Sequence, residues 1–214
     1  MFIELSEALD CPRCREGYGL VTFVTRSDRR RVLAGHLGCP LCEAEFPVVE
    51  GALGFGAPPR GPANGRGAPP ADPAAALRAA ALLGVGEGPG RVVLLGPDLA
   101  PLALEVARMA ERIEILAWVG ESAGNPAWDI SELARGVNPL LGAEPGRWPV
   151  RGGALDGVAL SGSSAAFLDE SARALRPGGR LVLLDPDGEA RQRLDGLGID
   201  EVASDATTWV GRRR

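Results

Sequence analysis

The feature that most restricts the fold of this 214-residue chain is the spacing of its four cysteines. They form two Cys-x2-Cys pairs, Cys11-Pro-Arg-Cys14 and Cys39-Pro-Leu-Cys42. Two residues between paired thiolates allow a tight turn that aims both sulfurs at one metal ion, and two such turns complete a tetrahedral site. The spacing therefore predicts a zinc ribbon whose Zn²⁺ is structural, because four thiolates leave no coordination position for a substrate.

Other interpretations of these cysteines remain open. Disulfides, an iron–sulfur cluster or a site that has lost its metal fit the same residues, and His36, the only histidine, is an alternative ligand. The first residues do not resemble a secretion signal, and no apolar run reaches the length of a membrane span. We therefore expect a cytoplasmic protein without membrane contact. In the reducing cytoplasm, metal binding by cysteines is favoured over disulfides.

The composition changes abruptly after the cysteine-containing segment. Residues 56–73 consist mainly of glycine, proline and alanine without apolar periodicity, which is typical of a linker. The linker divides the chain into a zinc ribbon over residues 1–55 and a second domain over residues 74–214, which contains no cysteine.

Residues 74–214 alternate between apolar strands and amphipathic helices. Asp72 and Pro73 predict the start of a helix that Gly84 ends. Further helices are expected at 100–112, 130–136 and 164–175, and strands at 91–95, 113–119, 157–161, 179–186, 199–204 and 207–213, with 147–150 as the weakest candidate. The pattern predicts a doubly wound, mostly parallel, seven-stranded α/β sheet. The two-residue connection after residue 204 predicts a C-terminal antiparallel hairpin.

The charge pattern gives little attraction to nucleic acid or membranes, because the formal net charge is −5. Two arginine clusters, residues 26–31 (RSDRRR) and 211–214 (GRRR), are local exceptions. Clustered guanidinium groups suit phosphate binding, so either cluster is a candidate contact for RNA, the alternative being a solvated loop. The single histidine argues against Ser-His or Cys-His catalysis.

The ribbon carries a first family resemblance. The segment LDCPRC holds the first cysteine pair, and HLGCPLCEAEFPVVEGALGFG runs from the second pair into Phe46-Pro47-Val48 and a Glu50-Gly51 turn. They resemble the small zinc-ribbon activator proteins that partner methyltransferases acting on tRNA, rRNA and release factors. They are also similar to the N-terminal ribbon of certain rRNA guanine methyltransferases. The resemblance implies a protein or RNA partner for this segment.

The second domain carries another resemblance. Residues 155–186, LDGVALSGSSAAFLDESARALRPGGRLVLLDP, include an L-R-P-G-G-R-L turn between a helix and a strand. This segment resembles strands four and five of the class I S-adenosylmethionine-dependent methyltransferase fold, and the predicted hairpin suits the antiparallel seventh strand of that fold. The resemblance implies S-adenosylmethionine as cofactor and RNA or protein as methyl acceptor.

The cofactor loop departs from that family, in which strand one ends in Gly-x-Gly-x-Gly and strand two in an acidic residue. Here VVLLGPDLAP retains one glycine, and a tryptophan stands near the end of strand two. The resemblance assigns the cofactor to Gly96, Pro97, Asp98 and Trp118. Ser161 to Ser164 would lie on the substrate side, and no catalytic residue is assigned. Glu121 is an alternative ribose ligand, and Glu144 or Asp156 an alternative adenine ligand.

Two functions follow from these residues. An active methyltransferase needs little beyond positioning of the acceptor against the methylsulfonium, so the lack of an acid–base pair does not exclude it. A non-catalytic methyltransferase-like activator or scaffold, a pseudoenzyme, is the alternative, because each cofactor group left without a partner costs about 1–3 kcal/mol of binding free energy. An RNA-binding module acting through the arginine clusters is a third hypothesis.

Overall fold

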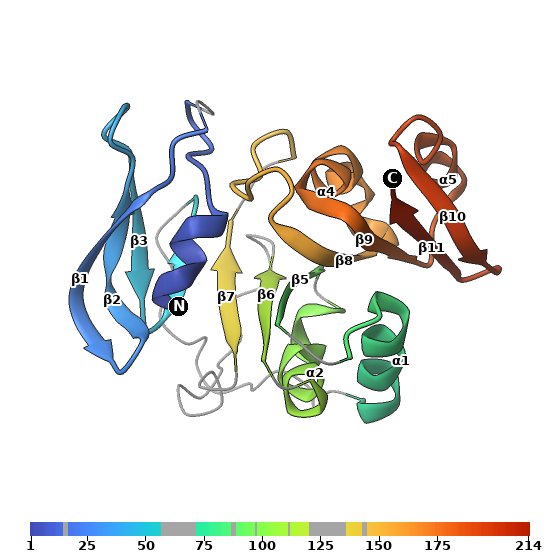
Figure 1. Ribbon diagram of the computed structural model, residues 1–214, viewed down its shortest axis with the longest axis horizontal. Helices are drawn as coiled ribbons and strands as arrows, with labels where there is room; N and C mark the ends of the chain where they lie inside the picture. The colour runs from blue at the N-terminus through green and yellow to red at the C-terminus, as the bar shows by residue number, and fades with distance from the viewer. Residues whose placement is uncertain are drawn as a thin grey trace.

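The computed structural model describes residues 1–14, 17–56, 72–86, 89–96, 98–110, 112–119, 136–142 and 145–214. One mixed sheet runs through the described chain in the spatial order β1-β2-β3-β4-β7-β6-β5-β8-β9-β11-β10 (Figure 1). Its strands are β1 (Val21–Asp28), β2 (Arg31–Gly38), β3 (Glu45–Val49), β4 (Ala52–Gly54), β5 (Gly90–Leu95), β6 (Ile113–Val119), β7 (Val137–Leu141), β8 (Leu155–Ser161), β9 (Leu175–Leu184), β10 (Ile199–Ser204) and β11 (Thr208–Arg213). The helices are η1 (Ile3–Ala8), α1 (Pro73–Leu83), η2 (Ala100–Leu102), α2 (Ala103–Met109), η3 (Gly162–Phe167), α4 (Leu168–Ala174) and α5 (Gly188–Arg193).

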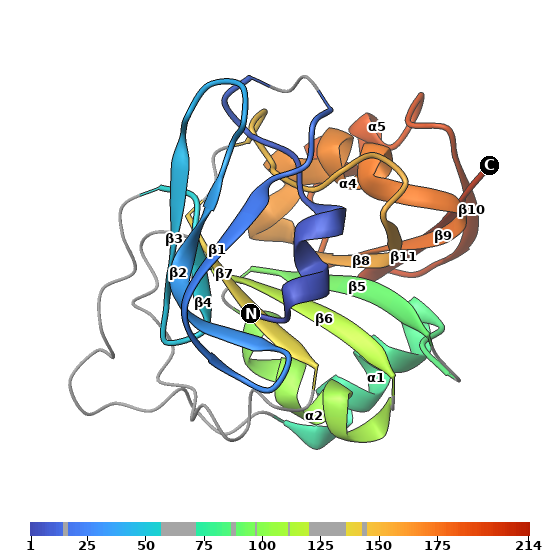
Figure 2. The same cartoon turned by 60° about the vertical axis from the view of Figure 1, so that its left-hand side comes forward.

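The centre of the sheet consists of five parallel strands, β7, β6, β5, β8 and β9. Helices α1, η2 and α2 contribute to the apolar core on one face, and η1, η3, α4 and α5 contribute to the core on the other. Figure 2 shows η1 lying over the face opposite α1 and α2. Strands buried on both faces read as continuous apolar runs, which is why this class was predictable. The α/β architecture predicted from the sequence is confirmed.

The C-terminal hairpin is also present. Strand β11 lies antiparallel between β9 and β10, with Val210 opposite Val182. The turn between β10 and β11 is held by Asp205, whose carboxylate accepts a 2.8 Å hydrogen bond from the backbone N–H of Thr207. An aspartate that bonds backbone two residues ahead stabilises a tight turn.

The predicted seven-stranded sheet is wrong, because the sheet formed by the described residues contains eleven strands, of which β5 to β11 lie within residues 74–214 and β1 to β4 within residues 1–55. The strands β1 to β4, which belong to the segment expected to be the ribbon, join the parallel strands through β4, which pairs in parallel with β7 at Leu53–Leu140 and Gly54–Leu141. The backbone N–H of Phe55 extends this pairing with a 2.8 Å hydrogen bond to the carbonyl of Leu141. An edge strand carries unpaired backbone groups, and pairing β4 with β7 satisfies the groups on both edges.

The third strand of the parallel region lies at Val137–Leu141, and residues 147–150 form no strand beyond an isolated bridge at Val150. Sequence reasoning treated the prolines in this region as breaks, and Pro139 lies inside β7. Since β4 pairs with β7 only at Leu140 and Leu141, Pro139 lies where one of its two sides has no neighbouring strand. Proline is tolerated at such positions because it has no N–H to contribute.

Helix α1 begins and ends as predicted. The Asp72 side chain accepts a 3.0 Å hydrogen bond from the backbone N–H of Ala74, and Gly84 ends the helix in the left-handed conformation at φ +67°. The expected helix at 130–136 falls almost entirely outside the described residues, as does most of the linker. None of the helices in the described chain is long and apolar enough to cross a membrane.

Candidate functional site

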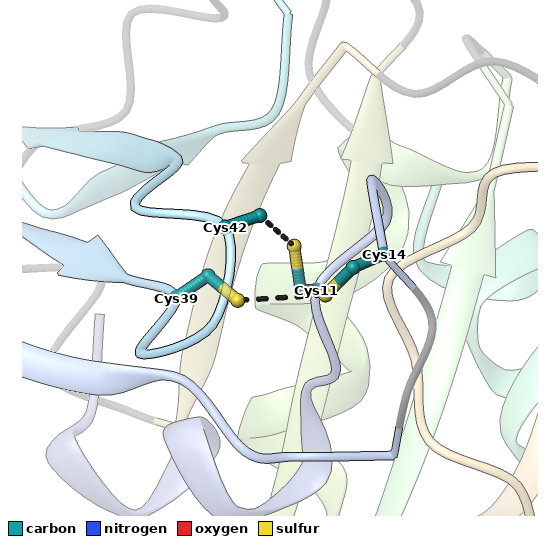
Figure 3. Close-up of side chains that lie close together, drawn as sticks. All are labelled: Cys11, Cys14, Cys39 and Cys42. Atoms are coloured by element: carbon teal, nitrogen blue, oxygen red, sulfur yellow. Dashed lines mark hydrogen bonds between the residues drawn. The ribbon is translucent and has the colours of Figure 1, made fainter.

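The four cysteine sulfurs converge on one point. All four lie within 4.8 Å of one another, with 3.6 Å between the Sγ atoms of Cys11 and Cys42 and 3.5 Å between those of Cys14 and Cys39 (Figure 3). A Zn–S bond of about 2.3 Å places the sulfurs of a tetrahedral site about 3.8 Å apart. The four thiols are not joined in disulfides. The cluster therefore fits a four-sulfur zinc site.

The second cysteine pair is shaped by the turn between β2 and β3. The backbone N–H of Glu43 donates to the carbonyl of Cys39 at 3.1 Å, and the N–H of Cys39 donates to the carbonyl of Ala44 at 2.9 Å. Glu43 takes a left-handed conformation with φ +56°. This geometry closes the turn and brings both sulfurs to one side, as the Cys-x2-Cys spacing requires.

Two of the thiols differ strongly in acidity. Burial raises the pKa of the Cys11 thiol to about 12. Burial also acts to raise the pKa of the Cys39 thiol. Hydrogen bonds from the backbone N–H groups of Cys42 and Leu41 and from neighbouring thiols outweigh burial, so the pKa falls below that of an ordinary thiol, to about 7. Zinc binds thiolates, so metal binding must displace the proton that Cys11 otherwise retains.

His36, the alternative ligand, lies outside the cysteine cluster. Its ring stacks on Phe23 at 4.6 Å between centroids, and its Nε2 lies 3.6 Å from the carboxylate of Glu45. The group of side chains able to hold a metal in the described chain contains cysteines only. The geometry therefore favours the four-cysteine ligand set.

The first cysteine pair is tied to the segment between β7 and β8. The N–H of Asp10 donates to the carbonyl of Pro149 at 2.7 Å, and the N–H of Arg151 donates to the carbonyl of Ala8 at 2.9 Å. The side chains of Asp10 and Arg151 form an ion pair at 2.9 Å. The ribbon is thus attached to the parallel region at this point as well as through β4.

A second candidate site lies at the carboxyl ends of the parallel strands. The sheet order reverses between β5 and β8, and α/β sheets bind ligands in the crevice at such a reversal. Gly96 follows β5 there, donates a 3.2 Å hydrogen bond to the carbonyl of Trp118, and accepts from the N–H groups of Leu99 and Ala100. Its φ of +124° is accessible in practice to glycine alone.

Serine hydroxyls surround Gly96. The Oγ of Ser161 lies 2.9 Å from that of Ser163 and 3.3 Å from that of Ser164. A Cβ atom on Gly96 would lie 2.4 Å from the Ser161 Oγ. The retained glycine therefore makes room for the chain's own hydroxyl groups, which can donate or accept hydrogen bonds at this edge.

Among the other assigned residues, Asp98 is exposed and Pro97 lies outside the described residues. The alternatives Glu121 and Glu144 also lie outside them. Asp156 stands at the amino end of β8, where its carboxylate accepts from the N–H of Arg91 at 2.6 Å and pairs with Arg176. Asp156 is therefore at the opposite edge of the sheet from Gly96.

Trp118 lies at the carboxyl end of β6 and is 1% exposed. Its indole is parallel to the ring of Phe55, with 6.3 Å between centroids, and meets Trp148 edge-on at 5.7 Å. The aromatic series continues to Phe46 on one side and to Phe167 on the other. Any ligand that stacks on Trp118 must displace one of these contacts.

Both indoles also carry an unused donor. Within the described residues, neither the Nε1 of Trp118 nor that of Trp148, which is 3% exposed, has a hydrogen-bond acceptor. A buried donor without an acceptor costs about 1–3 kcal/mol, so both indoles require acceptors from outside the described residues. Sequence reasoning missed Trp148 and Phe55, although Phe55 follows directly on β4 and Trp148 stands two residues before the isolated bridge at Val150.

The arginines of the ribbon cluster have separate structural contacts. Arg26 pairs with Glu50 at 2.5 Å, and Arg30 pairs with Glu4. Arg31 is buried over the ring of Phe2 at 4.8 Å, and burial lowers its pKa to about 10. These contacts oppose the use of residues 26–31 as one phosphate-binding surface.

Comparison with known proteins gives structural similarity only. No protein-family model and no curated protein sequence matches this chain. A SAM-dependent O-methyltransferase of Thermotoga maritima is 15% identical over 66% of this chain and 65% of that chain, with a TM-score of 0.48, so this chain spans less than two thirds of it. A geranyl diphosphate methyltransferase in complex with SAM is 13% identical over 61% of this chain and 66% of that chain, with a TM-score of 0.48. A chain of the Haloferax volcanii complex between the Trm112 methyltransferase activator and a putative methyltransferase is 19% identical over 62% of this chain and 70% of that chain, with a TM-score of 0.48.

Proposed function

We propose that this protein is a methyltransferase that binds S-adenosylmethionine at the carboxyl edge of β5 and β6. The observation that carries the proposal is the pair of buried indole N–H groups of Trp118 and Trp148, which lack acceptors among the described residues. Trp118 is bonded through its carbonyl to Gly96, at the sheet reversal where such folds bind ligands. The cofactor supplies a methyl group on a sulfonium, and its ribose and carboxylate oxygens are the acceptors that unpaired indole donors require.

The other assigned residues have roles consistent with their places in the chain. Gly96, Pro97 and Asp98 follow β5 in the sequence, and the exposed carboxylate of Asp98 would accept a hydrogen bond from a cofactor ammonium or hydroxyl. The hydroxyls of Ser161, Ser163 and Ser164 provide polar contacts for an RNA or protein substrate beside it. Methyl transfer then depends on holding acceptor and methyl group in line, which needs no acid–base pair.

The zinc ribbon acts in this proposal as a permanent structural part of the enzyme. Its β4 pairs with β7, and its Phe55 covers Trp118. Residues 1–55 and 74–214 would then form two units of one active protein, and the zinc would take no part in the chemistry because its four thiolates leave no open position.

A second function is favoured by one specific observation. Phe55 lies parallel to Trp118 at an interplanar angle of 6°, on the face where an adenine would stack. A chain that fills its own base position needs no cofactor, and the protein would then serve as a methyltransferase-like scaffold or activator for another enzyme.

Calorimetric titration of zinc-replete protein with S-adenosylmethionine and S-adenosylhomocysteine separates the two functions. The first predicts saturable binding that Asp98→Ala or Trp118→Phe weakens by about tenfold, since each removes one hydrogen-bonding group. Asp200→Ala, which removes an exposed carboxylate paired with Arg214, is the matched control and leaves binding unchanged. Absence of heat at millimolar ligand from folded protein would overturn the enzyme and support the scaffold.

A further inference from the structure

A hollow with a volume of about 250 Å³ lies at the amino edge of the sheet, opposite Gly96. It is bounded by the loop between α1 and β5, by the starts of β6 and β8, and by β9 and β11. Among the described residues, its lining includes three arginines, Arg176, Arg180 and Arg212, and one acidic residue, Asp156. We call it the arginine hollow. Neither the zinc site nor the proposed cofactor edge uses any of these residues.

The carboxylate of Asp156, the one acidic group among the described lining residues, is already engaged. One oxygen of Asp156 accepts from the backbone N–H of Arg91 at 2.6 Å, and the other pairs with Arg176. The described part of the lining therefore carries three guanidinium charges against one carboxylate that has two partners. Such an excess of positive charge in a concave surface attracts small anions.

Two of the arginines are held in place through one donor each. The Nη1 of Arg180 donates to the carbonyl of Leu82 at 3.2 Å, at the C-terminal end of α1. The Nε of Arg212 donates to the carbonyl of Gly178 at 3.3 Å. A guanidinium group has five N–H donors, so most donors of both side chains are not used by these contacts. The negative end of α1 offsets part of the charge of Arg180 but of neither other arginine.

Glycines leave the arginines uncovered. The φ of +67° at Gly84 favours glycine, and a Cβ there would lie 2.7 Å from the Nη1 of Arg180 and would force that guanidinium group to move. A Cβ on Gly86 would meet no atom within 4 Å. Residues 84–86 and 89–90 thus form a wall of small and apolar residues that places no charged side chain over the hollow.

We propose that the arginine hollow binds the phosphate group of a small phosphorylated ligand. Guanidinium forks match the oxygens of phosphate and form strong charge-assisted hydrogen bonds with it. The volume is below the roughly 300–1,000 Å³ typical of pockets for drug-sized ligands, which favours a phosphate with a small organic part or free phosphate. The site does not depend on the proposed methyltransferase activity, because it lies at the other edge of the sheet.

Calorimetric titration of the full chain at low salt tests the site with inorganic phosphate and with ribose 5-phosphate. Tighter binding of ribose 5-phosphate identifies an organic phosphate as the ligand, and equal or weaker binding identifies free phosphate. Replacing both Arg176 and Arg212 by Gln should weaken binding of either probe by at least about tenfold, since each loses charged hydrogen bonds. Arg26→Gln, a matched loss of one exposed arginine on the ribbon, should leave it unchanged.

A second pair of variants keeps the test valid if loss of two arginines disturbs folding. Gly86→Asp adds a carboxylate to the wall at a position without steric conflict, and Gly86→Asn adds the same shape without charge. The aspartate should weaken phosphate binding by about tenfold and the asparagine should not, because only the former repels the anion. Undetectable binding of both probes at 10 mM, or equal weakening by Arg26→Gln, would overturn the proposal.

Discussion

The ring of Phe55 lies parallel to the indole of Trp118, with 6.3 Å between their centroids and 6° between their planes. Phe55 follows the last ribbon strand and Trp118 ends the second strand of the parallel region. Phe46 extends the contact into the ribbon at 5.0 Å, and Trp148 extends it toward the helices at 5.7 Å. The ribbon and the parallel strands therefore share one aromatic core in addition to one sheet.

The first prediction concerns this contact. Phe55→Ala should lower the free energy of unfolding by about 2–3 kcal/mol, somewhat less than for a fully buried phenylalanine, because Phe55 is partly exposed. Phe23→Ala, on the outer ribbon strand where the ring is 51% exposed, should cost less than about 1 kcal/mol. Urea unfolding of zinc-replete protein measures both free energies. Equal losses would show that the aromatic stack stabilises the protein no more than the exposed Phe23 ring does.

The second prediction concerns the metal. The purified protein should hold one Zn²⁺ per chain, and Cys39→Ser should reduce both zinc content and thermal stability, because a structural zinc site contributes its binding free energy to folding. Loss of zinc should also change the fluorescence of Trp118 and Trp148, because Phe55 of the ribbon packs against Trp118.

His36→Ala is the control for the metal prediction. Its imidazole stacks on Phe23 and lies outside the cysteine cluster, so the variant should retain full zinc content. Metal analysis by mass spectrometry decides the matter. Loss of zinc from the His36 variant, with the four cysteines intact, would show that the ligand set is not the four thiolates.

The sequence predicted those features that depend on short-range chemistry. The four cysteines were identified by spacing alone, because two residues between thiolates leave few geometries. The ends of α1 followed from Asp72 and Gly84, whose side chain and backbone freedom act within one helical turn. The α/β class followed from strands that are apolar throughout, since burial on both faces leaves no alternation.

Features that depend on long-range pairing were not predicted. The sheet was expected to end within residues 74–214, but β4 contributes only three residues, Ala52–Gly54, too short for a periodic pattern. Strand β7 was not predicted because it contains Pro139. A proline is tolerated there because β4 pairs with β7 only from Leu140 onward. The burial of Trp118 likewise depends on Phe55, which is far away in the sequence and is brought near by that pairing.

The third prediction tests the packing at Gly96. Gly96→Ala should lower the free energy of unfolding by at least about 1–3 kcal/mol, because φ is +124° and the new Cβ would lie 2.4 Å from the Ser161 Oγ. Ser161→Ala in the same chain should recover part of the loss, since it removes the clashing oxygen and leaves the backbone strain. A double-mutant cycle by urea unfolding measures the coupling, and strictly additive losses would contradict the close packing of these two residues.

The last prediction concerns the different contributions of Arg213 and Arg214 to stability. The Nη1 of Arg213 donates to the carbonyls of Ala172, Arg173 and Leu175 at the C-terminal end of α4, with distances of 2.9 and 2.8 Å to the first two. Arg213→Gln should therefore lower the free energy of unfolding by about 1.5–3 kcal/mol, the range for hydrogen bonds to a charged group. A cation at this end of a helix also interacts favourably with the helix dipole, and that contribution is lost too.

Arg214→Gln supplies the matched control, since it removes the same charge one residue further on. Arg214 pairs with Asp200 at 2.8 Å, but both side chains are well exposed, so this change should cost at most about 1 kcal/mol. The comparison also bears on RNA binding by the terminal cluster. A capping role for Arg213 predicts that the two variants differ in thermal unfolding and retain RNA equally, whereas a phosphate-binding role predicts equal stability and a shared loss of RNA retention at low salt.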